Sequence, residues 1–353
     1  MSKLNLAIVF GGKSTEHEIS LLSAKSILKH VNQEKYNLYL IYIDIAGKWS
    51  LKRAIDDQYS LPVALIPAKK GATLINTNSG EQLGNIDVAF PVLHGVFGED
   101  GTIQGLFKMM NVPFVGCGVM ASSACMDKDM TKRVLRDANI GIAPYAIATP
   151  THRPAFDELE KHLGTPVFIK PANLGSSVGV FKVSNAAEYA VKIEEALTFD
   201  PKVLIEKTIV GKEVECAVLG NAKPKASLPG EIVMETDFYD FESKYVDKDA
   251  SSTRIPADIT ESQIEIIREM AVKAYQAMGC EGLARVDFFV TNDGEILINE
   301  INTIPGFTNI SMYPKMWDAT GIPYTELIDI LIELGIERYN LEQQLQIVAR
   351  EVK

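Results

Sequence analysis

Residues 282–306 read GLARVDFFVTNDGEILINEINTIPG, two apolar runs separated by an Asn-Asp-Gly turn. A turn of this type between two apolar runs predicts a β-hairpin. Side chains two residues apart share a strand face, so Arg285 and Asp287 point the same way on the first strand. Glu300 and Asn302 do the same on the second strand. If the two strands pair through the turn, we expect these polar groups to meet on one surface.

Such a group of polar side chains at the end of apolar strands is unfavourable to bury without a partner. Carboxylate and amide oxygens suit Mg²⁺, which takes one or two carboxylates together with substrate phosphates. The sequence therefore predicts Asp287, Glu300 and Asn302 as metal ligands. The alternative is a buried ion pair between Arg285 and Asp287, which does not explain why the other two polar residues lie beside it.

The whole chain has the composition of a globular protein, with 353 residues of which 46% are hydrophobic and 23% charged. This length exceeds what one compact core usually holds, so we expect two or three domains. The formal net charge of −11 and the sequence pI of about 5.1 disfavour a nucleic-acid-binding protein. Any anion-binding site must then be a local basic patch.

The sequence favours a cytoplasmic protein that does not enter a membrane. The opening run MSKLNLAIVFGG is too short for a signal peptide and indicates a first strand. No stretch approaches the ~18 apolar residues of a membrane span. The cysteines form no CxxC motif, which favours reduced thiols, and the histidines form no HxxxH or HExxH pair, which disfavours zinc.

The N-terminal region predicts a strand over Leu4–Phe10, then a turn and a helix. Thr15 and Glu18 fit a capping box at the helix start. Glu16 then faces the space above the strand ends, where open α/β sheets bind ligands. The alternative role for Glu16 is compensation of the helix dipole, worth about 0.3–1 kcal/mol. The nearby GGKST is not a phosphate loop, because Ala7 stands where the first glycine is required.

Strands over 39–44 and 87–93 and a helix over 98–111 continue an alternating strand and helix pattern, with a hairpin possible within 53–82. This alternation is typical of an open α/β domain that ends near residue 117. A GxGxxA string over 116–121 resembles a dinucleotide motif, but no other feature supports that interpretation.

Residues 166–183, PVFIKPANLGSSVGVFKV, predict a strand, a loop of small residues and a second strand. In the loop Gly175–Gly179, small residues let backbone N–H groups approach phosphate oxygens, and Ser176 and Ser177 add hydroxyl donors. The alternative is a plain hairpin turn. Lys170 at the end of the first strand favours phosphate binding.

Further charged residues lie at the ends of predicted elements. A helix over 126–140 carries Lys128, Lys132 and Arg133. Glu206 closes one strand and Glu213 opens the next, where they could accept hydrogen bonds from adenine or ribose or simply be strand-end charges.

A long surface loop is expected over residues 235–253, which are polar and aromatic without periodicity. Loops of this length are often lids, and Lys244 and Tyr245 are its candidates for closing over a substrate. A helix is expected over 260–279, and the last helix over about 322–335.

Taken together, these motifs resemble those of the D-alanine–D-alanine ligases, members of the ATP-grasp superfamily. The resemblance runs through about residues 4–335. Its motifs are GGKSTEHEIS, LHGVFGEDGTIQG, GCGVMASSACMDK, FIKPANLGSSVGV, IEKTIVGKEVECAV, FYDFESKY, GLARVDFFV and NEINTIPGFTNISMYP.

The resemblance implies an α/β protein in which an N-terminal open α/β domain precedes a two-subdomain ATP-grasp fold of α+β type. The expected division is 1–117 for the substrate domain and 118–205 for the central subdomain. The C-terminal subdomain would be 206–353, with the metal site and the lid loop. ATP would lie between the second and third units.

The resemblance also implies roles for individual residues. The Gly175–Gly179 loop would fold over the γ-phosphate. The residues implied to contact ATP are Lys128 and Lys170 at the α and β phosphates, Ser177 and Lys244 near the γ-phosphate, and Glu206, Lys207, Ile209 and Glu213 at adenine and ribose. The ligands implied for two Mg²⁺ ions, with Mn²⁺ as a substitute, are Asp287, Glu300 and Asn302.

In the family, a Glu, a Ser and a Tyr form a hydrogen-bonded triad that closes the site, and these match Glu16, Ser176 and Tyr245. Glu16 would also hold the ammonium group of the first D-alanine. The remaining implied site residues are His94 near the first D-alanine, Arg285 and the Gly306 N–H in the oxyanion hole, and Ser311 and Met312 at the second D-alanine.

The expected activity is ATP-dependent synthesis of D-alanyl-D-alanine through a D-alanyl phosphate, for peptidoglycan precursors. A homodimer is expected, with no nucleic-acid partner. One alternative is a D-alanine–D-lactate ligase, whose members tend to replace the lid tyrosine, so that Tyr245 favours the dipeptide. Two others are a nicotinamide-dependent oxidoreductase, based on the GxGxxA string, and a non-catalytic nucleotide sensor.

Overall fold

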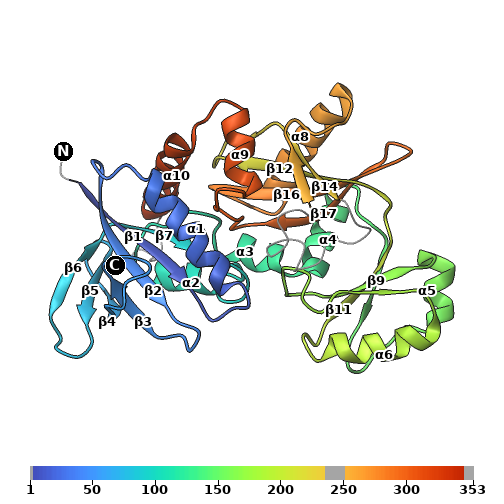
Figure 1. The fold of residues 1–353 in the computed structure, drawn as a ribbon, viewed down its shortest axis with the longest axis horizontal. Coiled ribbons are helices and arrows are strands. Elements are labelled where there is room, and N and C mark those ends of the chain that lie inside the picture. Colours follow the sequence, from blue (N-terminus) through green and yellow to red (C-terminus); the bar gives the residue numbers. More distant parts are fainter. Residues whose placement is uncertain (1–2, 235–250, 346–353) are drawn as a thin grey trace, which may run out of the picture.

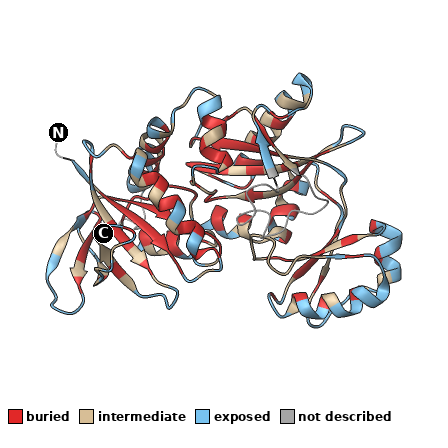
Figure 2. Cartoon of the chain, in the orientation of Figure 1, coloured by how far each residue is buried: buried red, intermediate tan, exposed pale blue. Residues whose placement is uncertain are grey.

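The computed structural model describes residues 3–234 and 251–345, and within these residues the chain forms three β-sheets with helices packed around them (Figure 1). The mixed α/β class predicted from the sequence is confirmed. Figure 2 shows that buried residues gather in the inner strands of the sheets, whereas the outer faces of the helices are exposed.

The first sheet contains, among the described residues, seven strands in the order β6-β5-β4-β3-β2-β1-β7. Strand β1 pairs in parallel with β2 and β7, and the remaining pairs are antiparallel. The open α/β start is thus confirmed, and the stretch expected to hold a hairpin forms an antiparallel meander. The elements are β1 (Leu4–Gly11), α1 (His17–His30), β2 (Tyr36–Ile43), β3 (Trp49–Lys52), β4 (Leu61–Pro67), β5 (Ala72–Asn76), β6 (Gln82–Ile86), β7 (Val88–Val92) and α2 (Thr102–Met109).

The second sheet is antiparallel throughout, in the order β10-β9-β11-β8. Leu159 and Ile193, from its two helices, pack with Ile169 and Ile205 of the strands in a core of their own. The predicted strand, small-residue loop and strand are β9, the loop and β10. The elements are β8 (Tyr145–Ala148), α5 (Phe156–Leu163), β9 (Val167–Pro171), β10 (Phe181–Val183), α6 (Ala186–Leu197) and β11 (Val203–Lys207).

The third sheet has the order β15-β14-β12-β16-β17, with β13 paired to β12. The helices α3, α4 and α8 share one core with its strands. The elements are α3 (Val119–Met126), α4 (Lys128–Asp137), β12 (Gly211–Leu219), β13 (Lys225–Ala226), β14 (Gly230–Met234), β15 (Ser251–Arg254), α8 (Glu261–Ala277), β16 (Leu283–Thr291) and β17 (Ile296–Asn302).

The loop predicted over 235–253 is wrong at its C-terminal end. Residues 251–253 belong to β15, because they pair with β14 and extend the sheet. Residues 235–250, which include Lys244 and Tyr245, lie outside the described residues.

The last helices are α9 (Met312–Ala319) and α10 (Tyr324–Gln343), which extends eight residues beyond the predicted end at 335. Trp317 and Leu331 of these helices share a core with Phe10 of β1. The C-terminal part of the chain therefore packs directly on the N-terminal sheet. None of the helices in the described part of the chain has the length and apolar character needed to cross a membrane.

The cores follow the sheets rather than the chain order. Residues 119–137, which fall in the expected central unit 118–205, pack with the third sheet through Ala121, Cys125 and Leu135. The division at 117 and 205 therefore remains a prediction about how the chain is organised.

Candidate active site

The hairpin formed by β16 and β17 places the predicted polar residues side by side. Arg285 is in register with Asn302, and Asp287 is in register with Glu300. The register shifts between Asp287 and Phe288, which produces a β-bulge. The predicted juxtaposition is confirmed, and it depends on this bulge, because continuing the pairing of Phe288 with Ile298 without a shift would place Asn299 opposite Asp287.

Arg285 binds Asp287 with two hydrogen bonds, from Nε to Oδ1 at 2.7 Å and from Nη2 to Oδ2 at 2.6 Å. Its Nε also lies 3.1 Å from Oε2 of Glu215 on β12, and the Asn302 amide donates to Asp287 Oδ2 at 2.9 Å. The ion pair considered as the alternative is thus present, as part of a larger polar network. Glu215 was not predicted from the sequence, although it lies two residues after Glu213 on β12 and therefore shares its strand face.

Lys128 brings a positive charge to this network. It is the first residue of α4, whose start is fixed by Asp127, because the Asp127 side chain accepts from the backbone N–H groups of the first turn. Lys128 Nζ lies 3.9 Å from Glu300 Oε2 and donates to the carbonyl of Leu174 at 2.5 Å. The structure therefore brings together a predicted phosphate contact and a predicted metal ligand.

Glu206, at the end of β11, lies between two lysines. Its Oε1 is 2.6 Å from Lys132 Nζ, and its Oε2 is 2.6 Å from Lys170 Nζ. Burial alone would raise the pKa of this carboxyl, but Lys170 and Lys132 lower the pKa to about 2. Glu206 is therefore ionised at neutral pH and is not a simple strand-end charge.

The other residues predicted at adenine and ribose follow on the same segment. Lys207 ends β11 and is exposed, Ile209 lies between the strands, and Glu213 is in register with Phe289 within β12. Burial by itself would lower the pKa of Lys170. Nearby carboxylates, Glu206 most strongly and Glu213 among the weaker ones, raise this pKa above its ordinary value. The structure thus places Glu213 close enough to Lys170 to affect its charge.

Glu16 accepts a short hydrogen bond from the hydroxyl of Ser176, which lies in the loop between β9 and β10. Ser176 and Ser177 both have left-handed backbones, with φ of 52° and 58°. Such conformations are uncommon for residues other than glycine and recur at ligand-binding loops.

The capping box predicted for Thr15 and Glu18 is wrong. Helix α1 begins at His17, and its N-cap is Glu16, with no hydrogen bond from the cap side chain to the helix. Ser14 Oγ accepts from the Glu16 N–H at 3.0 Å. The Glu16 carboxylate is directed to Ser176 instead, which disfavours a role limited to the helix dipole.

His94 is buried next to the loop that follows β17. Its Nδ1 lies 3.0 Å from the carbonyl of Ile304, and its Nε2 lies 3.2 Å from Ser23 Oγ. Since a carbonyl only accepts, Nδ1 carries the proton. Burial lowers the pKa of His94, so the neutral ring is favoured.

Glu99 is a further residue of this region that sequence analysis did not identify. Its carboxyl oxygens accept from the backbone N–H of Gly95 at 2.9 Å and from that of Ile304 at 3.2 Å. Burial and the charge of Glu16 raise the pKa of Glu99 to about 8. Its position in LHGVFGEDGTIQG, after a predicted strand end, was the available signal.

Gly306, expected in the oxyanion hole, and Ser311, expected at the second D-alanine, lie close together in the structure. Ser311 Oγ accepts from the Thr308 N–H at 2.9 Å, and a Cβ at Gly306 would lie only 2.8 Å from that oxygen. The side chain of Met312 packs in the core beside Gly230, so a substrate contact by Met312 would come from its backbone.

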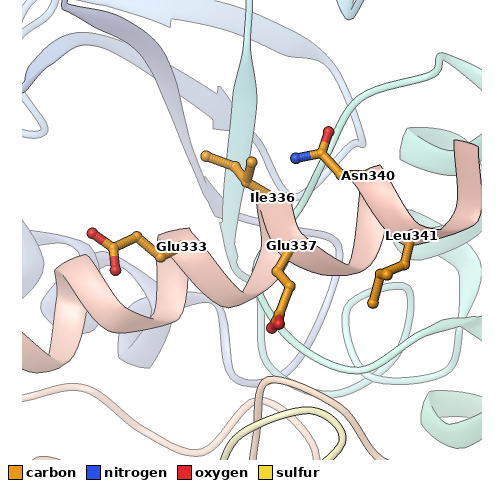
Figure 3. A pocket seen from close by; sticks show the side chains of 5 residues that line it. All are labelled: Glu333, Ile336, Glu337, Asn340 and Leu341. Atoms are coloured by element: carbon orange, nitrogen blue, oxygen red, sulfur yellow. The ribbon is translucent and has the colours of Figure 1, made fainter.

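A separate surface pocket lies along α10 and is lined by Glu333, Ile336, Glu337, Asn340 and Leu341 (Figure 3). None of these residues belongs to the predicted site. Within residues 3–234 and 251–345, no group of three or more His, Cys, Asp or Glu side chains has the arrangement of a metal site. Metal binding at β16 and β17 would therefore depend on two carboxylates, Asn302 and ligand oxygens.

Comparison with family models gives two matches. The model described as "D-ala D-ala ligase N-terminus" matches residues 5–117, and the model described as "D-ala D-ala ligase C-terminus" matches residues 134–333. Among curated proteins, the D-alanine–D-alanine ligase A of Salmonella typhimurium is 48% identical over 361 residues, covering 98% of this chain and 99% of that protein.

Solved structures give the same result. A D-alanine–D-alanine ligase from Coxiella burnetii has a TM-score of 0.88 and 38% identity, covering 98% of this chain and 97% of its own. A D-Ala:D-Ser ligase from Enterococcus faecalis has a TM-score of 0.84 and 36% identity, covering 95% of this chain and 100% of its own. A D-alanine–D-alanine ligase from Bacillus anthracis complexed with ATP has a TM-score of 0.76 and 27% identity, covering 97% of this chain and 100% of its own.

Proposed function

The chain belongs to the D-alanine–D-alanine ligase family, and we propose that it joins two D-alanine molecules into D-alanyl-D-alanine while converting ATP to ADP and phosphate. This is an ATP-grasp ligase activity that supplies a precursor of peptidoglycan. The observation that carries the proposal is the register of Asp287 with Glu300, because it sets two carboxylates beside Lys128 on one surface.

The nucleotide would lie between the second and third sheets, where its two ends meet different residues. Lys128 of α4 and Lys170 of β9 would neutralise charge on the phosphate oxygens. The residues proposed for the adenine and ribose end are Glu206, Lys207, Ile209 and Glu213. Ser177, in the loop whose backbone adopts left-handed conformations, would meet the γ-phosphate.

The donor set of β16 and β17 fits Mg²⁺. Asp287 and Glu300 supply hard carboxylate oxygens. The side-chain amide of Asn302 lies beside them, with its Nδ2 2.9 Å from Asp287 Oδ2. Amide orientation is not fixed by geometry alone, and a rotated Asn302 presents its oxygen instead. These three residues would hold two Mg²⁺ ions, with Mn²⁺ as a substitute. When bound, they would neutralise charge that develops on the transferred phosphoryl group.

The chemistry follows from the weakness of a carboxylate as an electrophile. A carboxylate oxygen of the first D-alanine attacks the γ-phosphorus and releases ADP, which gives an acyl phosphate. The amine of the second D-alanine then attacks the acyl carbon, and inorganic phosphate leaves. Glu16 would hold the first ammonium group near His94, and Ser311 and the Met312 backbone would bind the second substrate. Arg285 and the Gly306 N–H would stabilise the oxyanion.

Closure over this site is also part of the proposal. The acyl phosphate must be shielded from water, and Ser176 already joins its loop to Glu16. Tyr245 would complete a triad with these two residues, and Lys244 would add charge near the phosphates. We also propose the division 1–117, 118–205 and 206–353, a homodimer, and a cytoplasmic location, where both substrates are available.

The alternatives are less well supported. The D-alanine–D-lactate reading is disfavoured by Tyr245 and by the names of the relatives at 48% identity. The GxGxxA string does not form a dinucleotide loop, because α2 and not a strand is the element that precedes α3, and Gly116 packs against Gly282. A sensor without catalysis has no need for the network around Arg285 together with the Glu16–Ser176 contact.

Product analysis tests the proposed function. The protein is incubated with ATP, Mg²⁺ and D-alanine, and the product is identified by mass, with L-alanine and with D-alanine plus D-lactate in parallel. We expect D-alanyl-D-alanine, one ADP per dipeptide and no product from L-alanine. A depsipeptide as main product would move the specificity to D-lactate, and no D-alanine-dependent ADP would contradict the proposed activity.

A further inference from the structure

Lys132 is a fully buried lysine that the reaction described above does not use. It lies on α4 with an exposed fraction of 1%, and its Nζ is 2.6 Å from Oε1 of Glu206. The other oxygen of Glu206 is bound by Lys170, also at 2.6 Å. One carboxylate is therefore shared by two lysines that come from different elements.

We propose that Lys132 is a positioning residue that keeps Glu206 ionised and in place. When the nucleotide binds, Lys170 moves from Glu206 to the nucleotide phosphates. Glu206, still paired with Lys132, then accepts a hydrogen bond from the adenine amino group. This inference rests on the proposed function, because it needs Lys170 at the phosphates and Glu206 at adenine.

The two lysines differ in how firmly they are held. Both ammonium groups lie within range of a cation–π interaction, Lys132 at 5.5 Å from the centroid of the Tyr145 ring and Lys170 at 5.9 Å from that of the Phe168 ring. The difference is in burial, because the Lys132 side chain is only 2% exposed. The Lys170 side chain is 16% exposed and reaches Asn299 Oδ1 on β17 at only 3.4 Å. Lys132 is thus confined, whereas Lys170 lies at the border of the site and can reorient.

Burial decides what happens when Lys170 leaves. Glu206 is 3% exposed, and a buried carboxylate with no counter-charge is strongly unfavourable. Lys132 prevents that situation, because it stays on Oε1 while Oε2 becomes available. Without Lys132, the most favourable partner for Glu206 is Lys170, which would then be withheld from the phosphates.

The arrangement also has a consequence for the choice of base. An ionised carboxylate only accepts hydrogen bonds, so it favours the amino group of adenine and repels the carbonyl oxygen that guanine has at that position. If Lys132 is lost and Glu206 becomes protonated, the carboxyl group can donate to that carbonyl. Loss of Lys132 should therefore reduce discrimination between the two bases as well as affinity.

The test measures ADP and GDP binding by calorimetry in the wild type, in Lys132→Met and in Arg136→Met. Arg136 lies on the same helix, one turn further on, and is exposed, so its substitution controls for the loss of one positive charge. We expect Lys132→Met to bind ADP at least tenfold more weakly and to lose at least tenfold of the preference for ADP over GDP. Arg136→Met should match the wild type.

A double-variant comparison keeps the test valid even if Lys132→Met alone folds poorly. Lys132→Met combined with Glu206→Gln removes both charges of the pair, and it should bind ADP within threefold of Glu206→Gln alone. The inference would be overturned if Lys132→Met weakened ADP binding by the same factor in the wild type and in Glu206→Gln. It would also be overturned if Lys132→Met kept the wild-type preference for ADP over GDP. If the wild type itself does not bind ADP, the proposed function fails with it, which is a different result.

Discussion

Ser176, in the loop between β9 and β10, donates its hydroxyl hydrogen to the carboxylate of Glu16, which immediately precedes α1 and lies 160 positions earlier in the chain. The bond joins the second sheet to the first. Because Glu16 is also the residue proposed to hold the ammonium group of the first D-alanine, loop position and substrate binding are coupled through one side chain.

Ser176→Ala removes the donor and leaves Glu16 in place. We expect kcat to fall about 10–100-fold, since the loop would no longer be held to the substrate site by this bond. Steady-state kinetics measures the effect, and Ser60→Ala, on an exposed loop of the first sheet, is the control. Wild-type kinetics in Ser176→Ala would show that the contact has no part in catalysis.

Glu300→Gln keeps the shape of the side chain but removes a charge from the proposed metal site. Turnover should fall at least ~10³-fold, because the developing phosphoryl charge would lose its neutralising ion. The control is Glu295→Gln, an exposed residue of the same hairpin. Circular dichroism should show an intact fold in both variants. Activity near that of the wild type in Glu300→Gln would remove Glu300 from the metal site.

Gly306→Ala tests the contact between Gly306, whose N–H is proposed to bind the oxyanion, and Ser311. A Cβ at Gly306 would lie 2.8 Å from Ser311 Oγ, so one of the two groups must shift. We expect KM for the second D-alanine to rise about tenfold, in line with misplacement of a binding group. Gly105→Ala, where a Cβ meets no atom within 4 Å, is the matched control. An unchanged KM would argue against Ser311 as the carboxylate anchor.

Glu99 should make stability depend on pH. Its folded-state pKa, about 8, is raised above the ordinary value by burial and by Glu16. The folded state therefore retains a proton that the unfolded state releases. The contribution of Glu99 to the free energy of unfolding is thus fully present below about pH 4.5 and is lost as pH rises toward 8. The slope from this group reaches up to about 1.4 kcal/mol per pH unit.

Urea denaturation between pH 5 and pH 9 measures this slope in the wild type and in Glu99→Gln. The variant should show a flatter dependence between pH 5 and 8. Glu81 is exposed in the connection between β5 and β6, and Glu81→Gln controls for the loss of one carboxyl group. Parallel curves for the wild type and Glu99→Gln would mean that Glu99 is already ionised in the folded state.

The hairpin could be predicted because its signals are local. The Asn-Asp-Gly turn predicted the pairing, and the period of two predicted which residues share a face within each strand. The register of Asp287 with Glu300 depends in addition on the β-bulge between Asp287 and Phe288, which sequence analysis did not predict. The contact of Glu16 with Ser176 had no such local signal, since nothing in either segment specifies its partner. Only the family resemblance implied it.

Two misses have identifiable physical reasons. The capping box at Thr15 and Glu18 was wrong because the helix begins later and tertiary contacts occupy Glu16. The role of Lys132 was overlooked, although it lies four residues after Lys128 and so shares its helix face. Burial decides its importance, and burial of a lysine is not visible in the sequence.

The central claim is that the first D-alanine is activated as an acyl phosphate, and ¹⁸O transfer tests it most directly. D-alanine labelled with ¹⁸O in its carboxylate is turned over with ATP and Mg²⁺, and the released phosphate is analysed by mass. We predict one ¹⁸O atom in the phosphate for each dipeptide formed, because the attacking carboxylate oxygen leaves with phosphorus. Dipeptide formation with unlabelled phosphate, or with AMP and pyrophosphate as products, would contradict the mechanism.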